Sequence, residues 1–301
     1  MFTTPILFLI FNREDTTRRV FEAIRLQKPR YLYVAADGPR KNKEGEVENC
    51  RRTREIINEI DWDCELKTLF REENLGCKNA VFSAISWFFE NEEQGIILED
   101  DCLPDASFFK YCEELLDRYR EDERIGHISG DCFFPQATDK NYSYNFSSFS
   151  HIWGWASWRR VWQNVDLNLP EWDKIKHDKK RRKNLFTGLG EEIYFSSFLA
   201  DSLANRDGKS VWDAQYLYSL RMQNQLSIYP TVNMVTNIGL NLDNATHTTR
   251  NNDKHSIDRD SMQFPLKHPE YIIRNKDLDK TTVRKLFFSF TRLFRYLIND
   301  Y

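Results

Sequence analysis

Several common functional motifs are missing from this chain of 301 residues. It has no G-x-G-x-x-G or G-x-x-x-x-G-K-[ST] pattern, which argues against a dinucleotide-binding fold and against a P-loop ATPase. Its six cysteines include no C-x-x-C pair, so they indicate reduced, mostly buried thiols in a cytosolic protein rather than a zinc site or a disulfide framework. No uninterrupted apolar run approaches 18 residues, so we expect no membrane-spanning helix.

The chain also lacks a charge imbalance, since its formal net charge is −3, and bulk electrostatics therefore do not favour a nucleic-acid partner. Hydrophobic residues make up 41% of the sequence, which is enough for a sizeable core. The length allows one large α/β domain or two small ones. The N-terminus has no basic region before its apolar run, so we interpret residues 5–11 as a first strand and not as a signal peptide.

The first 130 residues alternate between apolar runs and amphipathic stretches. This alternation predicts a parallel sheet with right-handed crossovers, in which ligands bind beyond the carboxyl ends of the strands. The predicted strands are 5–11, 31–36, 65–70, 95–98 and 125–129. A first helix is predicted to begin with Asp15 or Thr16 as its cap, and further helices are predicted over 51–60, 77–90 and 107–119.

Three consecutive acids, Glu99, Asp100 and Asp101, follow the buried apolar run 95–98 directly. An unpaired charge in a dry core costs several kcal/mol or more, so the strand must end at Glu99. The acids must then face water, a cation or a ligand. Mg²⁺ and Mn²⁺ bind oxygen ligands, typically one or two carboxylates together with substrate phosphates. The triplet is therefore either a metal–nucleotide site or an acidic corner with solvated side chains.

Two further strands end in polar residues. Asn12-Arg13 follows the first strand and Asp37-Gly38 follows the second. Three polar strand ends on one edge of a parallel sheet form a more specific signal than any one of them alone.

Aromatic residues are concentrated in the second half of the chain. Trp155, Trp158 and Trp162 have helical spacing, which predicts the core-facing edge of a helix, with a sugar-stacking platform as the alternative. The basic run 174–183 is either a solvated helix face or a site for an anionic acceptor or a phospholipid surface. Asp213 lies near the start of a helix predicted over 211–224, where capping and the helix dipole alone would favour an acid.

The last segments of the chain leave two questions open. Residues 237–247 form a polar loop that is a plausible lid, and His247 taken alone is more often a surface histidine. Residues 281–297 form an amphipathic helix with basic and apolar side chains. This helix suits either the interface of an anionic membrane or docking on the domain or on a second subunit.

Together these stretches resemble the GT-A glycosyltransferases. In motif they are similar to the N-acetylglucosaminyltransferase I type and to bacterial nucleotide-diphospho-sugar transferases of polysaccharide loci. The acid triplet resembles the family's DXD motif, and the resemblance covers roughly residues 3–250, more weakly beyond 165. The stretches that carry it are residues 5–19, Asp37-Gly38, Glu99-Asp100-Asp101, 104–109, Gly154-Trp155 and Trp212-Asp213.

The resemblance implies a role for each matching residue. Arg13 and Asp37 would contact the uridine of a UDP-sugar, and residues 74–78 would line the base and ribose side. Asp100 would lie near the ribose, and Asp101 would ligate Mn²⁺ or Mg²⁺. Asp213 would be the general base, and it is the single candidate because Ala214 stands where the N-acetylglucosaminyltransferase I pattern has a second acid. The predicted site comprises Asn12, Arg13, Asp37, Asn74, Lys78, Glu99, Asp100, Asp101, Asp213 and His247, of which His247 would cap the diphosphate or complete the metal shell.

The fold implied by the resemblance is a Rossmann-like GT-A domain over 1–250, with a mostly parallel twisted sheet flanked by helices. Residues 1–135 would bind the nucleotide-sugar, 136–250 would form the acceptor side, and 251–301 would be a tail with an amphipathic helix. The implied activity is an inverting, metal-dependent transfer from a UDP-sugar, with UDP-GlcNAc as first choice, to a glycan or lipid-linked acceptor of bacterial surface polysaccharide synthesis. The alternatives are a sugar-nucleotide nucleotidyltransferase, disfavoured because no Gly-rich basic loop follows the first strand, and a non-catalytic carbohydrate-binding protein. We expect a cytosolic protein, with peripheral contact at the inner face of the cell membrane if residues 281–297 bind lipid.

Overall fold

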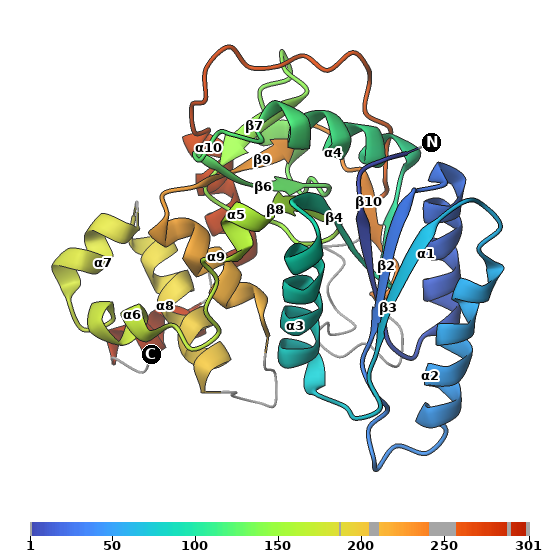
Figure 1. The fold of residues 1–301 in the computed structure, drawn as a ribbon. Coiled ribbons are helices and arrows are strands. Elements are labelled where there is room, and N and C mark those ends of the chain that lie inside the picture. Colours follow the sequence, from blue (N-terminus) through green and yellow to red (C-terminus); the bar gives the residue numbers. More distant parts are fainter. Residues whose placement is uncertain (1, 187, 205–210, 241–256, 288–289, 299–301) are drawn as a thin grey trace.

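The computed structural model describes residues 2–186, 188–204, 211–240, 257–287 and 290–298. In these ranges the chain forms an eight-stranded sheet in the order β3-β2-β1-β4-β8-β6-β9-β7 (Figure 1). Six strands run in one direction, while β7 and β8 run opposite to their neighbours. The predicted α/β fold with a mostly parallel sheet is therefore confirmed. The strands are β1 Ile6–Ile10, β2 Tyr31–Ala36, β3 Glu65–Phe70, β4 Gln94–Glu99, β6 Ile125–Ser129, β7 Tyr144–Ser147, β8 Trp155–Trp158 and β9 Leu226–Pro230.

Helices cover both faces of the sheet around its central strands. Helices α1 (Glu14–Gln27) and α2 (Glu46–Glu55) lie on one side of β1–β3, and α3 (Gly76–Asn91) lies on the other (Figure 1). Helix α4 (Ala106–Arg118) packs against β4, β6 and β8. Every residue of β1 is buried, and β1 pairs in parallel with β2 and β4. A strand covered on both faces reads as an unbroken apolar run, which is why residues 5–11 were recognisable.

The prediction of a helix through Trp155, Trp158 and Trp162 is wrong. Trp155 and Trp158 belong to β8, an antiparallel strand between β4 and β6, and Trp162 ends the short helix α5 (Arg159–Trp162). Residues 155 and 158 point to opposite faces of a strand, and both are buried because both faces of the sheet are covered. The interpretation of these tryptophans as core residues is confirmed.

Three helix boundaries differ from the predictions. Arg13 occupies the N-cap position of α1 and makes no side-chain cap bond there, so neither Asp15 nor Thr16 caps it. Helix α2 begins at Glu46 and passes into a 3₁₀ turn at Ile56–Glu59, where the sequence predicted a helix over 51–60. The predicted helix 281–297 is split into α10 (Lys276–Thr282), a π-helical turn (Val283–Phe287) and α11 (Phe290–Leu297).

A second group of helices stands to one side of the sheet (Figure 1). It has a core of its own, with Trp172, Phe195 and Tyr218 among its buried members. No described helix has the length and apolar character needed to cross a membrane. The helices of this group are α6 (Pro170–Ile175), α7 (Lys179–Leu185), α8 (Leu189–Leu203) and α9 (Asp213–Met222).

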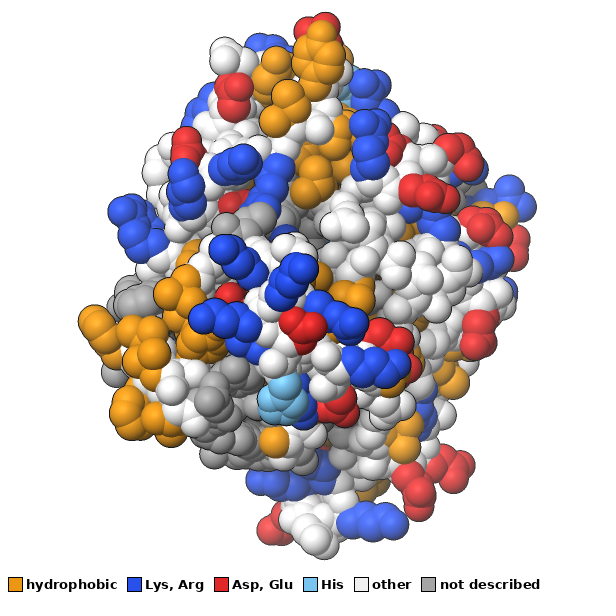
Figure 2. All heavy atoms as spheres, turned by 90° about the vertical axis from the view of Figure 1, so that its left-hand side faces the viewer, with side chains coloured by type: hydrophobic (Ala, Val, Ile, Leu, Met, Phe, Trp, Pro, Cys, Tyr) orange, Lys and Arg blue, Asp and Glu red, His pale blue; other side chains and the backbone are white. Residues whose placement is uncertain are grey.

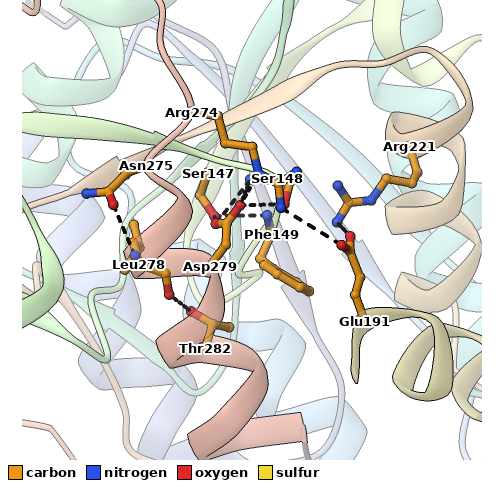
Figure 3. A network of polar contacts seen from close by, with 10 residues as sticks. All are labelled: Ser147, Ser148, Phe149, Glu191, Arg221, Arg274, Asn275, Leu278, Asp279 and Thr282. Carbon is orange, nitrogen blue, oxygen red and sulfur yellow. Dashed lines mark hydrogen bonds and ion pairs between the residues drawn. The ribbon is translucent and has the colours of Figure 1, made fainter. Parts of the chain in front are cut away.

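A buried polar network ties α10 to the sheet and to α8 and α9 (Figure 3). The Asp279 carboxylate accepts hydrogen bonds from Ser147 Oγ and Ser148 Oγ, each at 2.6 Å, and pairs with Arg274 Nε. Arg274 also lies 3.9 Å from Glu191 of α8, which pairs with Arg221 of α9 at 2.5 Å. The tail that follows residue 257 is therefore part of the folded body.

Candidate functional site at the carboxyl edge of the sheet

The acid triplet lies at the carboxyl end of β4, in the middle of the sheet. Ile96, Ile97 and Leu98 are fully buried, and the strand ends at Glu99 as predicted. Asp100 and Asp101 form the turn into β5 (Cys102–Pro104). Asp100 is only 3% exposed, so it does not face water.

Arg13 is the cation that joins this edge to the neighbouring strand β1. Its Nη1 donates to Asp101 Oδ2 at 3.0 Å, and its Nη2 pairs with Asp100 Oδ1. Arg13 thus pairs with two of the three acids of the triplet, and neither of its ion pairs includes Glu99. The predicted convergence of Arg13 with the acids is present in the structure, through an ion pair that the sequence did not specify.

Burial leaves these carboxylates poorly solvated. Burial, together with the charges of Asp101 and Asp100, raises the pKa of Glu99 to about 8. Burial also raises the pKa of Asp100 to about 7, although Arg13 acts in the opposite direction. Within the described ranges, Asp100 Oδ2 is buried without a hydrogen-bond partner. A divalent cation at this edge would coordinate that oxygen and, by its charge, favour the ionised form of these carboxylates.

The described residues provide only part of a metal shell. No group of three or more His, Cys, Asp or Glu side chains within them is arranged to hold a metal ion. Mg²⁺ commonly takes one or two carboxylates and completes its shell with substrate phosphates and water, and Asp101 with Asp100 fits that pattern. His247, the other predicted metal ligand, lies outside the described residues.

A short strand, β10 (Val235–Asn237), packs beside the acid triplet by pairing with β5, the strand that follows the acids. The pairing is antiparallel, and the N–H of Ile238 donates to the Asp101 carbonyl at 2.8 Å. A Cβ at Gly239 would lie 2.7 Å from Arg13 Nη1 and 2.8 Å from Asp101 Cβ. The first residues of the predicted lid 237–247 therefore pack on the acid triplet, and the part from residue 241 lies outside the described ranges.

Asp37, at the end of β2, is used to hold a loop. Its carboxylate accepts hydrogen bonds from Asn74 Nδ2 at 3.0 Å, from the Leu75 N–H at 3.0 Å and from the Gly76 N–H at 3.1 Å. This loop leads into α3, so Asp37 fixes the point where α3 begins. Asp37 and Asn74 thus contact each other, and a direct contact of Asp37 with a uridine stays a prediction.

Asn12, at the end of β1, has a structural partner that the sequence did not reveal. Its Nδ2 donates to Glu46 Oε1 at 2.9 Å, and Glu46 also accepts from the Arg40 N–H at 2.7 Å. Glu46 is buried, and the hydrogen bond from the Arg40 side chain lowers its pKa. Asn12 therefore holds the loop 40–46 against β1, and its predicted contact with the nucleotide stays untested.

The N-terminus of α3 brings the two halves of the chain together. The pKa of the Cys77 thiol is raised to about 12. Burial is the largest cause, and the charges of Glu99, Asp213 and Asp37 act in the same direction. The charges of three acids from different elements thus act on Cys77, whose side chain is exposed to solvent. With the Gln215 amide oriented to donate to the Val211 carbonyl, its oxygen accepts from Lys78 Nζ at 2.7 Å. Lys78 therefore links α3 to the first turn of α9.

Asp213 is the first residue of α9, and its half-buried carboxylate accepts from the Ala214 N–H at 3.0 Å. Burial raises its pKa to about 6. An aromatic cluster fixes this end of α9, since Trp212 stacks on Trp155 of β8 at a centroid distance of 5.8 Å. Trp155 of β8 thereby holds the first turn of α9, which carries the predicted base, against the sheet.

Asp131 is a candidate that the sequence analysis missed. It follows β6 at the same edge, is 1% exposed, and its Oδ1 has no hydrogen-bond partner among the described residues. Burial raises its pKa well above the usual range of an aspartate. The signal was present in the sequence, because Ser129-Gly130-Asp131 closes a strand with an acid, as Ala36-Asp37 does.

No protein-family model matches this chain, and no curated protein matches it. Among solved structures, it is similar to a cytidylyltransferase from Leptospira borgpetersenii serovar Hardjo-bovis, with 12% identity and a TM-score of 0.33 over 58% of this chain and 65% of that one. The chain thus spans less than two thirds of that relative. HddC from Yersinia pseudotuberculosis matches with 11% identity and a TM-score of 0.32, over 54% of this chain and 78% of that one. CMP:2-keto-3-deoxy-manno-octonic acid synthetase, complexed with CTP, matches with 14% identity and a TM-score of 0.32, over 60% of this chain and 86% of that one. Similarity at this level carries no argument about function, which has to come from the site.

Proposed function

We propose that the protein is a metal-dependent, inverting glycosyltransferase that uses a UDP-sugar, with UDP-GlcNAc as the first donor to test. The observation that carries this proposal is that a cluster of acids and a separate carboxylate with a raised pKa occur together at the carboxyl edge of the sheet. Glu99, Asp100 and Asp101 form a buried acidic cluster in which Asp100 Oδ2 has no hydrogen-bond partner among the described residues. Asp213 belongs to another element, its charge contributes to the raised pKa of Glu99, and its own pKa is raised to about 6. The first group suits a cation with a diphosphate, and the second suits a base that works near neutral pH.

The reaction would proceed by one displacement. An acceptor hydroxyl oxygen forms a bond to the anomeric carbon while the bond from that carbon to the diphosphate oxygen breaks. The hydroxyl proton passes to the Asp213 carboxylate, and the nucleoside diphosphate leaves. A cation held by Asp101 and the donor phosphates would supply charge neutralisation at the leaving diphosphate. Arg13 keeps the carboxylates of Asp100 and Asp101 in place through its two ion pairs.

A sugar-nucleotide nucleotidyltransferase is the second candidate, because acids at a strand end also serve that chemistry. Against it, β1 is followed by only Phe11, Asn12 and Arg13 before α1 begins, which leaves no room for a Gly-rich triphosphate loop.

A product assay distinguishes the candidates. The full chain is incubated with Mn²⁺ and a panel of UDP-sugars and sugar acceptors, and separately with UTP or CTP and sugar phosphates. Release of UDP, lost in Asp213→Asn, supports the glycosyltransferase. Release of pyrophosphate contradicts it and supports the nucleotidyltransferase. Tight sugar binding with neither product would support the non-catalytic carbohydrate-binding alternative.

A further inference from the structure

We propose that the side of the molecule formed by α11, α8 and α7 docks on an anionic lipid membrane. Figure 2 shows this side: hydrophobic side chains gather along one edge, beside a cluster of lysine and arginine side chains. The apolar group belongs to α11 and the basic group to α7, and both helices contact α8. The inference concerns a surface away from the acid triplet and does not depend on the proposed transfer.

Helix α11 presents its apolar side to solvent. Phe290, Phe294 and Leu297 are 81%, 63% and 69% exposed, and Ile298 beyond the helix is 56% exposed. Positions i, i+4, i+7 and i+8 share one face of a helix. A helix of a globular protein normally turns such a face toward the core, so an exposed one marks an interaction surface.

The opposite side of α11 is held to the protein by polar and cationic groups. Tyr296 Oη donates to Glu192 Oε1 of α8 at 2.6 Å, and the Arg292 guanidinium lies 5.0 Å from the centre of the Tyr194 ring. The orientation of α11 is therefore fixed by specific contacts. Its exposed apolar side is a consequence of these contacts, and rotating the helix to bury Phe294 would break them.

Helix α7 supplies the positive charge next to this apolar edge. Its buried Arg182 donates through Nε to the same Glu192 at 2.8 Å, so one carboxylate anchors α7 and α11 to α8. The other basic side chains of α7 are exposed, and one of them, Arg181, pairs with Asp178 at 3.2 Å. These exposed cations are Lys179, Lys180, Arg181 and Lys183.

Apolar side chains beside clustered cations match an anionic bilayer. The apolar side chains enter the boundary between headgroups and acyl chains, and the cations bind the anionic headgroups. A second copy of the chain fits less well, because a two-fold contact through this face would bring the same cations toward each other. No described helix is long enough to span a bilayer, so the docking is peripheral.

Vesicle flotation with the full chain tests the proposal. Vesicles of phosphatidylcholine alone are compared with vesicles containing 30 mol% phosphatidylglycerol, a composition chosen to give an anionic surface. We expect the protein to float with the anionic vesicles and to be released at about 0.5 M salt, because the Debye length shortens with ionic strength.

Two variants separate the apolar and the charged contributions. Phe290→Ser with Phe294→Ser removes the apolar contact, and Lys179→Glu with Lys180→Glu reverses charge on α7. Each should lower the vesicle partition coefficient about tenfold or more, in line with the loss of buried apolar area and of headgroup attraction. Two matched controls lie on the other side of the fold. Leu26→Ser removes an apolar side chain that is exposed like Phe294, and Lys41→Glu with Lys43→Glu reverses two exposed charges. Both controls should leave the vesicle partition coefficient unchanged.

Three results would overturn the proposal. The wild-type chain could stay unbound with anionic vesicles, or it could float equally well with phosphatidylcholine alone. It could also form a stable dimer by light scattering that Phe294→Ser dissociates, which would assign this face to a second copy. Thermal unfolding of each variant confirms that it is folded, and UDP binding, measured in parallel, reports on the proposed transferase site independently.

Discussion

The Asp213 carboxylate accepts a hydrogen bond from the Ala214 N–H of its own helix, and burial raises its pKa to about 6. A carboxylate with this pKa is largely ionised at pH 7 and basic enough to take a proton from a hydroxyl in the transition state. Asp213→Asn should therefore lose about 10²–10⁴-fold in kcat and keep its donor affinity. Steady-state kinetics and UDP titration measure both quantities. A large loss of UDP affinity in this variant would instead make Asp213 a binding residue.

Glu99 and Asp100 should make the unliganded protein less stable as the pH rises. Their folded pKa values, about 8 and about 7, lie above the unfolded values near 4. The folded state thus holds protons that the unfolded state has lost, and the free energy of unfolding falls as pH rises through this window. Buried His127, whose pKa is lowered to about 3, acts with the opposite sign below about pH 6.5, so the clean range is pH 6.5–8.

Urea unfolding at pH 6.5 and pH 8 measures this effect. We expect the wild-type chain to be less stable at pH 8, and the variant Glu99→Gln with Asp100→Asn to lose less stability over the same range. Equal losses in both proteins would contradict the environment described for the acid triplet.

The residues at the carboxyl edge of the sheet differ in how far their positions and partners could be predicted from the sequence. Glu99, Asp100 and Asp101 were predictable because three acids after an apolar run can occupy only a strand end. The partners of Asn12 and Asp37 were not, because Glu46 and the loop 74–76 are distant in sequence. A hydrogen bond between segments separated by more than 30 residues leaves no local pattern.

The attachment of helix α10 to the sheet depends on the buried carboxylate of Asp279. The exposed carboxylate of Asp277 in the same helix should matter far less. Asp279 satisfies Ser147, Ser148 and Arg274, whereas Asp277 is exposed and pairs with Lys280 at 3.2 Å (Figure 3). Asp279→Ala should cost about 3–5 kcal/mol of unfolding free energy, because it removes a buried carboxylate that pairs with Arg274 and accepts hydrogen bonds from Ser147 and Ser148. The control Asp277→Ala should cost less than about 1 kcal/mol. Urea unfolding compares them, and similar losses would mean that the network does not hold the tail.

The corner before β8 depends on Gly154. Its φ is +64°, and a Cβ there would lie 2.8 Å from Val235 Cγ2 of β10. Gly45 also has a positive φ, +74°, but a Cβ there would meet no atom within 4 Å. Gly45→Ala should therefore cost about 1–2 kcal/mol of backbone strain, and Gly154→Ala about 1–3 kcal/mol more from overpacking. Equal costs in urea unfolding would refute this crowding.

Element type was hardest to predict where tertiary structure overrides spacing. The separation of Trp155, Trp158 and Trp162 suits a helix, yet β8 is inserted between β4 and β6, and both of its faces are covered. In such a strand apolar residues need not alternate. The strands β1 to β4 were predicted closely, because turn and polar residues directly follow their apolar runs.

On the scale of the whole molecule, the site is built by segments from both halves of the chain. The carboxyl ends of β1, β2 and β4 meet at one edge by parallel topology, and this convergence was predictable from strand order. The approach of α9 was not, because it depends on Trp212 packing against Trp155. For α11 the sequence left membrane contact and docking on the protein as alternatives, since an amphipathic sequence does not tell which face meets the protein.

Calorimetric titration of UDP into the full chain, with and without Mn²⁺, tests the central claim most directly. If the carboxyl edge of the sheet binds a cation together with a diphosphate, wild-type protein should bind UDP with Mn²⁺ at least tenfold more tightly than without it, and Asp101→Ala should lose that difference. Titrations that are the same with and without Mn²⁺, or an Asp101→Ala variant that keeps the metal-dependent gain, would contradict the account.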